Sequence, residues 1–123
     1  MKPLNPEAVI EAVTKVSGVG RADLCGRKRT AHISHARKIL CYLLRTRCKM
    51  SYDSIAIILE NRDHTSIIYL CRECEKIKKE SDVYFQVWEE QAEKCNEILL
   101  RREGIEDGRE TEEPRQVETA VIS

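Results

Sequence analysis

The sequence has no long hydrophobic run, and aromatic residues make up only 5% of its 123 positions. No segment approaches the roughly 20 consecutive apolar residues that a membrane-spanning helix needs. The N-terminus, residues 1–6, also lacks the apolar stretch of a secretory signal. We therefore expect a soluble protein that stays in the cytoplasm, where it is made. The scarcity of aromatic side chains indicates a small domain with an aliphatic core.

A disulfide scaffold is not indicated either, although the chain has six cysteines. Disulfides form in secreted proteins, whereas this chain has no secretion signal and has enough aliphatic residues to build a core. We predict reduced thiols at all six positions, which are Cys25, Cys41, Cys48, Cys71, Cys74 and Cys95. The length of 123 residues fits one domain with a tail, and it is too short for a catalytic module beside a binding module.

Net charge is also lacking, with a formal value of +0, but the charges are segregated along the chain. Between residues 21 and 49 the acid Asp23 stands against nine basic residues, which are Arg21, Arg27, Lys28, Arg29, Arg37, Lys38, Arg45, Arg47 and Lys49. Residues 103–123 are instead rich in acids. This segregation predicts a polyanion-binding face on a domain of residues 1–102, followed by a disordered acidic tail over residues 103–123.

Apolar residues recur at helical spacing, and no segment alternates as a strand, so we predict an all-α fold. A capping Asn5 and Pro6 at the first helical position begin the first helix, which glycines 18 and 20 end. One helical turn over residues 21–25 and a basic loop over residues 26–30 follow. A long helix is predicted from about residue 31 to 47. Its residues Ile33, Ala36, Ile39, Leu40, Leu43 and Leu44 are expected to face the core, and Arg37, Lys38 and Arg45 to project outward.

Two short amphipathic segments, residues 51–59 and 63–80, are separated by a connector of only a few residues. This spacing predicts a helix-turn-helix, whose second helix can enter a DNA major groove. Asp63 or Asn61 can cap that second helix. The side chains of Asp63, His64 and Thr65 supply the hydrogen-bonding and methyl groups that distinguish bases there. A final helix begins after the capping signal at residues 81–82 and closes the core.

Residues from about 6 to 95 resemble the C-terminal DNA-binding domain of the bacterial replication initiator DnaA. The matching segments are Asp23-Leu24, Ala36-Arg37, Tyr42-Leu43-Leu44-Arg45, Ser51-Tyr52-x-x-Ile55 and Arg62-Asp63-His64-Thr65-Ser66-Ile67. The last of these is similar to the family's signature Arg-Asp-His-Thr-Thr-Val. The spacing from Arg29 to Thr65 follows the family pattern without a gap. The resemblance implies a compact, Trp-repressor-like helical bundle.

The resemblance also implies that the chain binds a short asymmetric duplex site, the DnaA box, as a monomer in a bacterial or phage-infected cell. Arg29 then reads bases in the minor groove, and Asp63, His64 and Thr65 read bases in the major groove. Arg37, Arg45 and the backbone around Ser51 and Tyr52 match positions near phosphates in the family. We also expect phosphate contacts from Lys38, Arg62 and Ser66, and a general electrostatic contribution from Arg27 and Lys28. The implied role is replication initiation or its regulation, with other replication or regulatory proteins reached through the last helix and tail.

The chain departs from the family pattern at several positions. Lys38 stands where a Gln is common, Ala56 replaces a typical Gly, and Leu59-Glu60-Asn61 replaces the usual Phe-Gly-Gly turn. We expect Asn61 to adopt a left-handed conformation, which Asn tolerates. Glu60 places an acid near the expected phosphates. No Gly-x-x-x-x-Gly-Lys-Ser/Thr loop occurs, so we expect no ATPase activity, no enzymatic activity and no cofactor.

Other interpretations of these residues stay open. Asp63 and His64 also fit a helix cap beside an exposed histidine, whereas a catalytic pair is disfavoured because no nucleophile accompanies it. Cys71-x-x-Cys74 has the spacing of a metal knuckle, but within a helix these cysteines are better explained as small apolar core residues, and we predict no metal site. His32 and His35 either contact the DNA backbone or are exposed. The alternative functions are a helical protein-interaction adaptor and a transcriptional regulator of a phage or mobile element.

Overall fold

The computed structural model describes residues 2–107 of the chain, and the side chains of residues 2–102. Within that range it contains helices and no strand, which confirms the predicted all-α fold. The helices are α1 (Pro6–Ser17), α2 (Arg21–Cys25), α3 (Ala31–Thr46), α4 (Tyr52–Ile58), α5 (His64–Glu80) and α6 (Asp82–Asp107). None of the described helices is both long enough and apolar enough to span a membrane.

Local sequence accounts for where these helices begin. The Asn5 side chain accepts a hydrogen bond from the backbone N–H of Glu7 at 2.9 Å, and Pro6 occupies the first position of α1. Ser51 caps α4 by accepting from the backbone N–H of Ser54 at 3.1 Å. Each cap satisfies a backbone amide that has no partner within its own helix.

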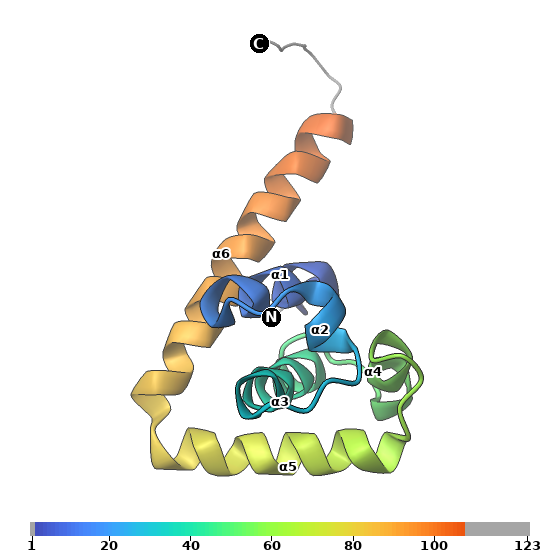
Figure 1. Cartoon of the computed structure of the whole chain (residues 1–123). Helices are drawn as coiled ribbons and strands as arrows, with labels where there is room; N and C mark the ends of the chain where they lie inside the picture. Colours follow the sequence, from blue (N-terminus) through green and yellow to red (C-terminus); the bar gives the residue numbers. More distant parts are fainter. Residues whose placement is uncertain (1, 108–123) are drawn as a thin grey trace.

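Helix α3 occupies the centre of the molecule, with the other helices arranged around it (Figure 1). Helix α5 passes along one side of α3 and meets α4 at one end, and α6 turns back from the other end to pack against α1. All six apolar residues that were predicted to face the core from α3 are buried. From α6 the core receives Phe85, Trp88, Ala92 and Cys95.

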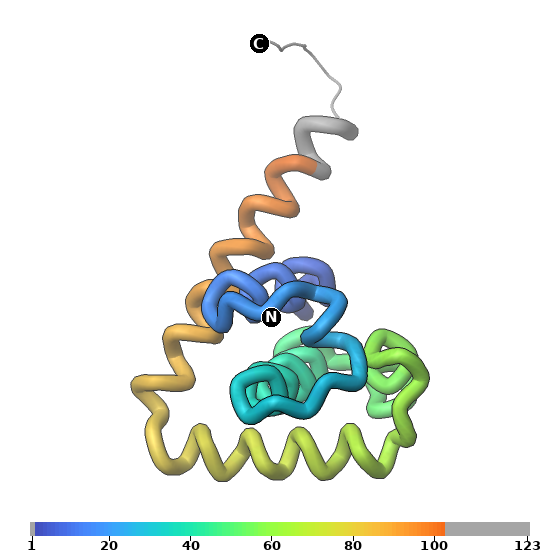
Figure 2. The backbone as a smooth tube through the Cα atoms, in the orientation of Figure 1, coloured from blue at the N-terminus to red at the C-terminus, as the bar shows by residue number. Residues whose placement is uncertain are grey.

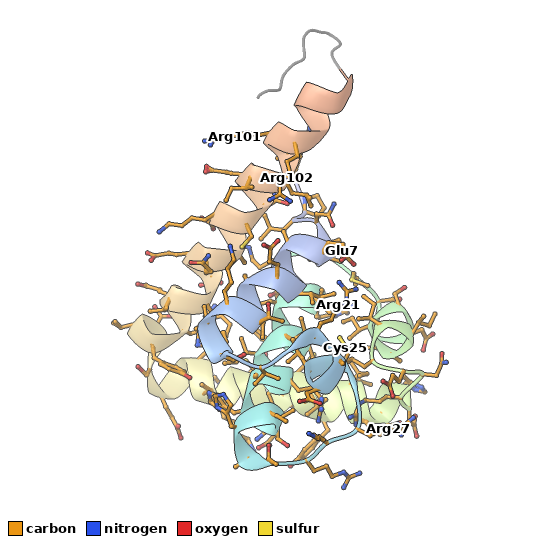
Figure 3. The ribbon with its side chains drawn as sticks, turned by 45° about the horizontal axis from the view of Figure 1, so that its top comes forward. Glu7, Arg21, Cys25, Arg27, Arg101 and Arg102 are labelled. Carbon is orange, nitrogen blue, oxygen red and sulfur yellow. The ribbon has the colours of Figure 1, made fainter. Side chains whose placement is uncertain are left out.

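Ion pairs tie the outer helices to this centre. Arg21 of α2 lies beside Glu7 of α1 (Figure 3), with nitrogen–oxygen distances of 2.6 and 3.1 Å. Arg47, which follows α3, donates to Glu93 of α6 at 2.6 Å.

The predicted domain boundary at residue 102 falls inside α6, which continues to Asp107. Residues 103–107 are therefore helical, and the rest of the predicted tail lies outside the described residues.

The six cysteines are free, as the sequence predicted, and all six are also buried. Burial raises the pKa of the Cys71 thiol to about 11 and that of Cys74 to about 12. Burial also raises the pKa of Cys41 well above its ordinary value. These thiols therefore behave as small apolar side chains, which agrees with the core interpretation of Cys71 and Cys74.

Candidate nucleic-acid interface

A tight turn connects α4 to α5 and sets the direction of the second helix. Glu60 and Asn61 both have left-handed backbone conformations, with φ of 59° and 57°. The conformation of Asn61 was predicted, whereas that of Glu60 was not. The backbone N–H of Arg62 then donates to Ala56 O at 3.1 Å and closes the turn. Two successive left-handed residues explain why glycines are common at these positions, since left-handed backbone is costly for other residues.

The predicted base-reading residues lie at the exposed start of α5. The Asp63 side chain caps the helix by accepting from the backbone N–H of Thr65 at 3.1 Å, as predicted. Asp63 and His64 keep 70% and 59% of their side-chain surface exposed, and the His64 Nδ1 atom lies 3.7 Å from Asp63 Oδ1. Thr65 and Ser66 are also exposed. The first turn of α5 therefore presents donors, acceptors and the Thr65 methyl group outward.

The basic loop, residues 26–30, packs against the α4–α5 turn. Figure 2 traces this loop between α2 and α3. Arg62 donates to Gly26 O at 2.5 Å, and Arg27 donates to Glu60 O at 3.1 Å. Each segment therefore provides an arginine that donates a hydrogen bond to a backbone carbonyl of the other segment. A Cβ on Gly26 would lie 2.6 Å from the carbonyl oxygen of Ala22, so the loop can leave α2 in this direction only with glycine at position 26.

Arg37 does not project outward as predicted. Its side chain is only 3% exposed, and it donates to Leu24 O at 2.9 Å and to Asp23 O at 2.8 Å. Both acceptors are backbone carbonyls in α2, just before the basic loop. Burial lowers the pKa of the Arg37 guanidinium, and the nearby charge of Arg62 lowers it further. The arrangement makes Arg37 a support for the basic loop.

An open groove of about 560 Å³ separates the basic loop and α3 from the start of α5. Its cationic lining residues are Arg29, Arg37, Lys38 and Arg62. Its hydroxyl groups come from Ser34, Thr65, Ser66 and Tyr69, and Asp63 also lines it. The groove thus joins the predicted minor-groove reader Arg29 to two of the three predicted major-groove readers. Several cations around one concave surface attract a polyanion.

A second group of predicted contact residues lies where α3 leads into α4. The Arg45 guanidinium stacks 4.3 Å from the centre of the Tyr52 ring, and Arg45 donates to Met50 O at 3.0 Å. Ser51 caps α4 beside them. Lys28 lies apart from this group and forms an exposed ion pair with Asp23 at 3.7 Å. Four of the predicted phosphate-contacting residues thus line the groove, three lie at the junction of α3 and α4, and Arg27 and Lys28 belong to neither group.

Both histidines of α3 have partners within the protein. His32 Nε2 lies 2.6 Å from Ser17 O, which makes it a donor to the end of α1. His35 Nε2 lies 2.7 Å from the hydroxyl of Tyr84 on α6. Burial lowers the pKa of His35, and Lys38 and His32 lower it further. Each histidine thus has a structural contact that the sequence did not indicate.

Tyr69 is an exposed residue of α5 that also lines the groove, and it was not among the residues predicted from the sequence. It lies four residues after Thr65, and residues four apart share a face of a helix. The four-residue spacing from Thr65 was the feature of the sequence that could have identified Tyr69. The signature segment, Arg62-Asp63-His64-Thr65-Ser66-Ile67, ends before this position.

The family model described as the bacterial DnaA protein helix-turn-helix matches residues 6–74. Similar proteins include the chromosomal replication initiator proteins DnaA of Thermodesulfovibrio yellowstonii, 32% identical over 81 residues, and of Tropheryma whipplei, 34% identical over 104 residues. These matches cover 66% and 80% of this chain but 18% and 20% of the relatives, so the chain spans about a fifth of their length. No solved structure gives a significant match.

The family match extends from α1 into α5 and includes the basic loop, α4, the turn and the first part of α5. It confirms the resemblance that the sequence motifs indicated. Homology to this domain supports DNA binding, with double-stranded DNA as the partner. Because the match covers more than half of the 123 residues, the chain belongs to the family of the bacterial DnaA helix-turn-helix domain.

Proposed function

We propose that the chain binds specifically to short asymmetric duplex sites similar to the DnaA box. The observation that carries this proposal is the cationic groove between the basic loop and α5. Arg29 lines it from one side, and Asp63 and Thr65 line it from the other. In the proposed complex, Arg29 reads the minor groove from one wall, Asp63 and Thr65 read the major groove from the other, and the DNA strand that separates the two grooves runs between them.

The proposed mechanism separates orientation from base reading. Phosphates are held by Lys38, Arg62 and Ser66 in the groove and by Arg45, Ser51 and Tyr52 at the junction of α3 and α4. These contacts set the orientation of the domain. Arg27 and Lys28 add charge at the loop. Arg29 enters the minor groove, while Asp63, His64 and Thr65 meet base edges in the major groove. Arg37 has no direct contact in this mechanism, because its guanidinium is buried against α2.

The proposed biological role is replication initiation or its regulation, with the domain acting as a monomer and without ATPase activity. The names of the relatives support this role, since they are chromosomal replication initiator proteins. The matched segment contains a helix-turn-helix and carries no nucleotide-binding loop motif. The domain's own contribution is therefore to select the site at which other replication or regulatory proteins act.

A gel-shift experiment at moderate salt tests the proposal. The chain is titrated against a DnaA-box duplex and against a scrambled duplex of the same composition. We expect clear preference for the box, and we expect Thr65→Ala to reduce that preference while leaving binding to the scrambled duplex unchanged. Val87→Ala is the matched control, because Val87 is 52% exposed on α6 and outside the groove. Equal binding of wild-type protein to both duplexes would refute site-specific binding.

A protein-interaction adaptor is the second candidate. The observation that favours it is the exposure of large apolar side chains on one face of α6, where Val83 is 76%, Val87 is 52% and Ile98 is 43% exposed. Exposed apolar groups of this kind are typical of docking surfaces when they gather on one face. The same gel-shift separates the candidates, because an adaptor needs no preference for the DnaA-box duplex.

A further inference from the structure

The tyrosine on α5 has an environment unlike those of the other three tyrosines. Tyr69 is 60% exposed. By contrast, the Tyr42 ring lies 5.4 Å from that of Phe85, Tyr52 stacks with Arg45, and the Tyr84 hydroxyl is 2.7 Å from His35. The surrounding fold therefore accounts for three tyrosines, while Tyr69 presents most of its surface to solvent.

Tyr69 and Thr65 lie on the same side of α5. The buried residues of α5 are Ile67, Cys71 and Cys74, which define its core-facing side. Thr65 and Tyr69 lie four residues apart on the opposite side, and both line the cationic groove. Four residues correspond to about 6 Å along a helix axis. Tyr69 is thus one helical turn further into the surface that the proposed function assigns to the DNA major groove.

We infer that Tyr69 is a specificity-determining residue whose ring packs against the C5-methyl group of a thymine in the major groove. This inference rests on the proposed function. A displacement of about 6 Å along α5 is nearly two steps of about 3.4 Å between bases, so Tyr69 reaches beyond the bases that Asp63, His64 and Thr65 read. Thymine is the base that presents a methyl group in the major groove.

The neighbours of Tyr69 favour a base contact over a phosphate contact. Arg29 and Lys38 line the same groove and supply positive charge for phosphates. Tyr69 adds no charge there, but its ring offers a larger apolar area than the methyl group of Thr65 at the start of α5. An exposed aromatic ring among cations and hydroxyls is therefore suited to the one apolar group on a base edge.

The experiment begins with selection of preferred sites from random duplex DNA by the wild-type chain. Each thymine of the selected site is then replaced by uracil, which removes only the methyl group. We expect one replacement to weaken wild-type binding about fourfold, the effect of one buried methyl group. Tyr69→Phe should keep that fourfold difference because it keeps the ring. Tyr69→Ala should bind the thymine and uracil duplexes equally, and Val87→Ala should behave as wild type.

The possible failures are distinguishable. If the wild-type chain selects no preferred site, the proposed function fails and this inference fails with it. If a site is selected but every thymine-to-uracil penalty is unchanged in Tyr69→Ala, the inference is overturned and the proposed function stands. A uniform loss of affinity on all duplexes in Tyr69→Ala, with a shallower salt dependence, would place Tyr69 on a phosphate and also overturn the inference. The helical circular dichroism of each variant verifies that it is folded.

Discussion

The buried guanidinium of Arg37 leads to a prediction about stability. Arg37→Ala removes two hydrogen bonds from a charged donor to the carbonyls of Leu24 and Asp23. Hydrogen bonds of this type contribute about 1.5 kcal/mol or more each, so we expect the free energy of unfolding to fall by about 3 kcal/mol. For a domain of this size that corresponds to a decrease in Tm of roughly 12 °C or more. The basic loop should also lose its position.

Thermal unfolding followed by circular dichroism measures this effect, and the salt dependence of DNA affinity provides the second readout. Lys38→Ala is the matched control, because Lys38 lines the same groove but is only partly buried. We expect Lys38→Ala to change Tm little and to reduce the slope of log affinity against log salt by about 0.9, the value for one phosphate contact. If Arg37→Ala instead leaves Tm unchanged and reduces that slope, Arg37 is a phosphate contact and the structural assignment is wrong.

Four further predictions concern the interface and its supports. Thr65→Ala should cost about 1–3 kcal/mol on the selected site and little on random DNA, and equal losses in the two binding assays would show that Thr65 does not read sequence. Arg45→Ala should weaken binding to all duplexes and reduce the salt slope, so an unchanged slope would remove Arg45 from the phosphate contacts. Glu60→Gly should stabilise the fold by about 0.5 kcal/mol, because glycine adopts the left-handed backbone without strain, although it also increases the entropy of the unfolded chain. Glu60→Gly should also raise affinity for all DNA because it removes an acid. Glu60→Gln should raise affinity without stabilising the fold, and urea unfolding measures this difference in stability. The lowered pKa of His35 means that the unfolded chain binds its proton more readily, so stability should be full above pH 6.5, the ordinary value, and decrease as pH falls below it. His35→Gln should flatten this pH dependence, and an unchanged profile would assign it to other groups.

The helices were predictable because their signals are local. Ile33, Leu40 and Leu44 recur at helical spacing, and all three are buried in α3. Asp63 could be identified as a cap because capping depends on only the next few backbone amides. The exposed start of α5 followed from the same local chemistry, so the position of the predicted base-reading residues relative to their own helix was accessible from sequence.

Contacts between distant segments were not predictable in this way. Arg37 lies on the same stripe of α3 as Ile33 and Leu40, at spacings of four and three residues, but its charge led to the prediction that it projects outward. Its burial depends on two carbonyls of α2, and nothing in the local sequence indicates that they lie within reach. The partners of His32 and His35 are likewise on α1 and α6. The left-handed conformation of Glu60 depends on closure of the turn, and it opposes the preference of glutamate for a negative φ.

The paired bonds from Arg62 to Gly26 and from Arg27 to Glu60 have a consequence for the DNA itself. They hold the basic loop against the start of α5, which are the two elements that we propose to read bases. Inserting one base pair between the two parts of a site lengthens the duplex by about 3.4 Å and rotates it by about 35°. Under the proposed function, a loop and a helix that are held together in this way cannot follow both changes, so we expect recognition to require the correct interval between the two parts of the site as well as the correct bases.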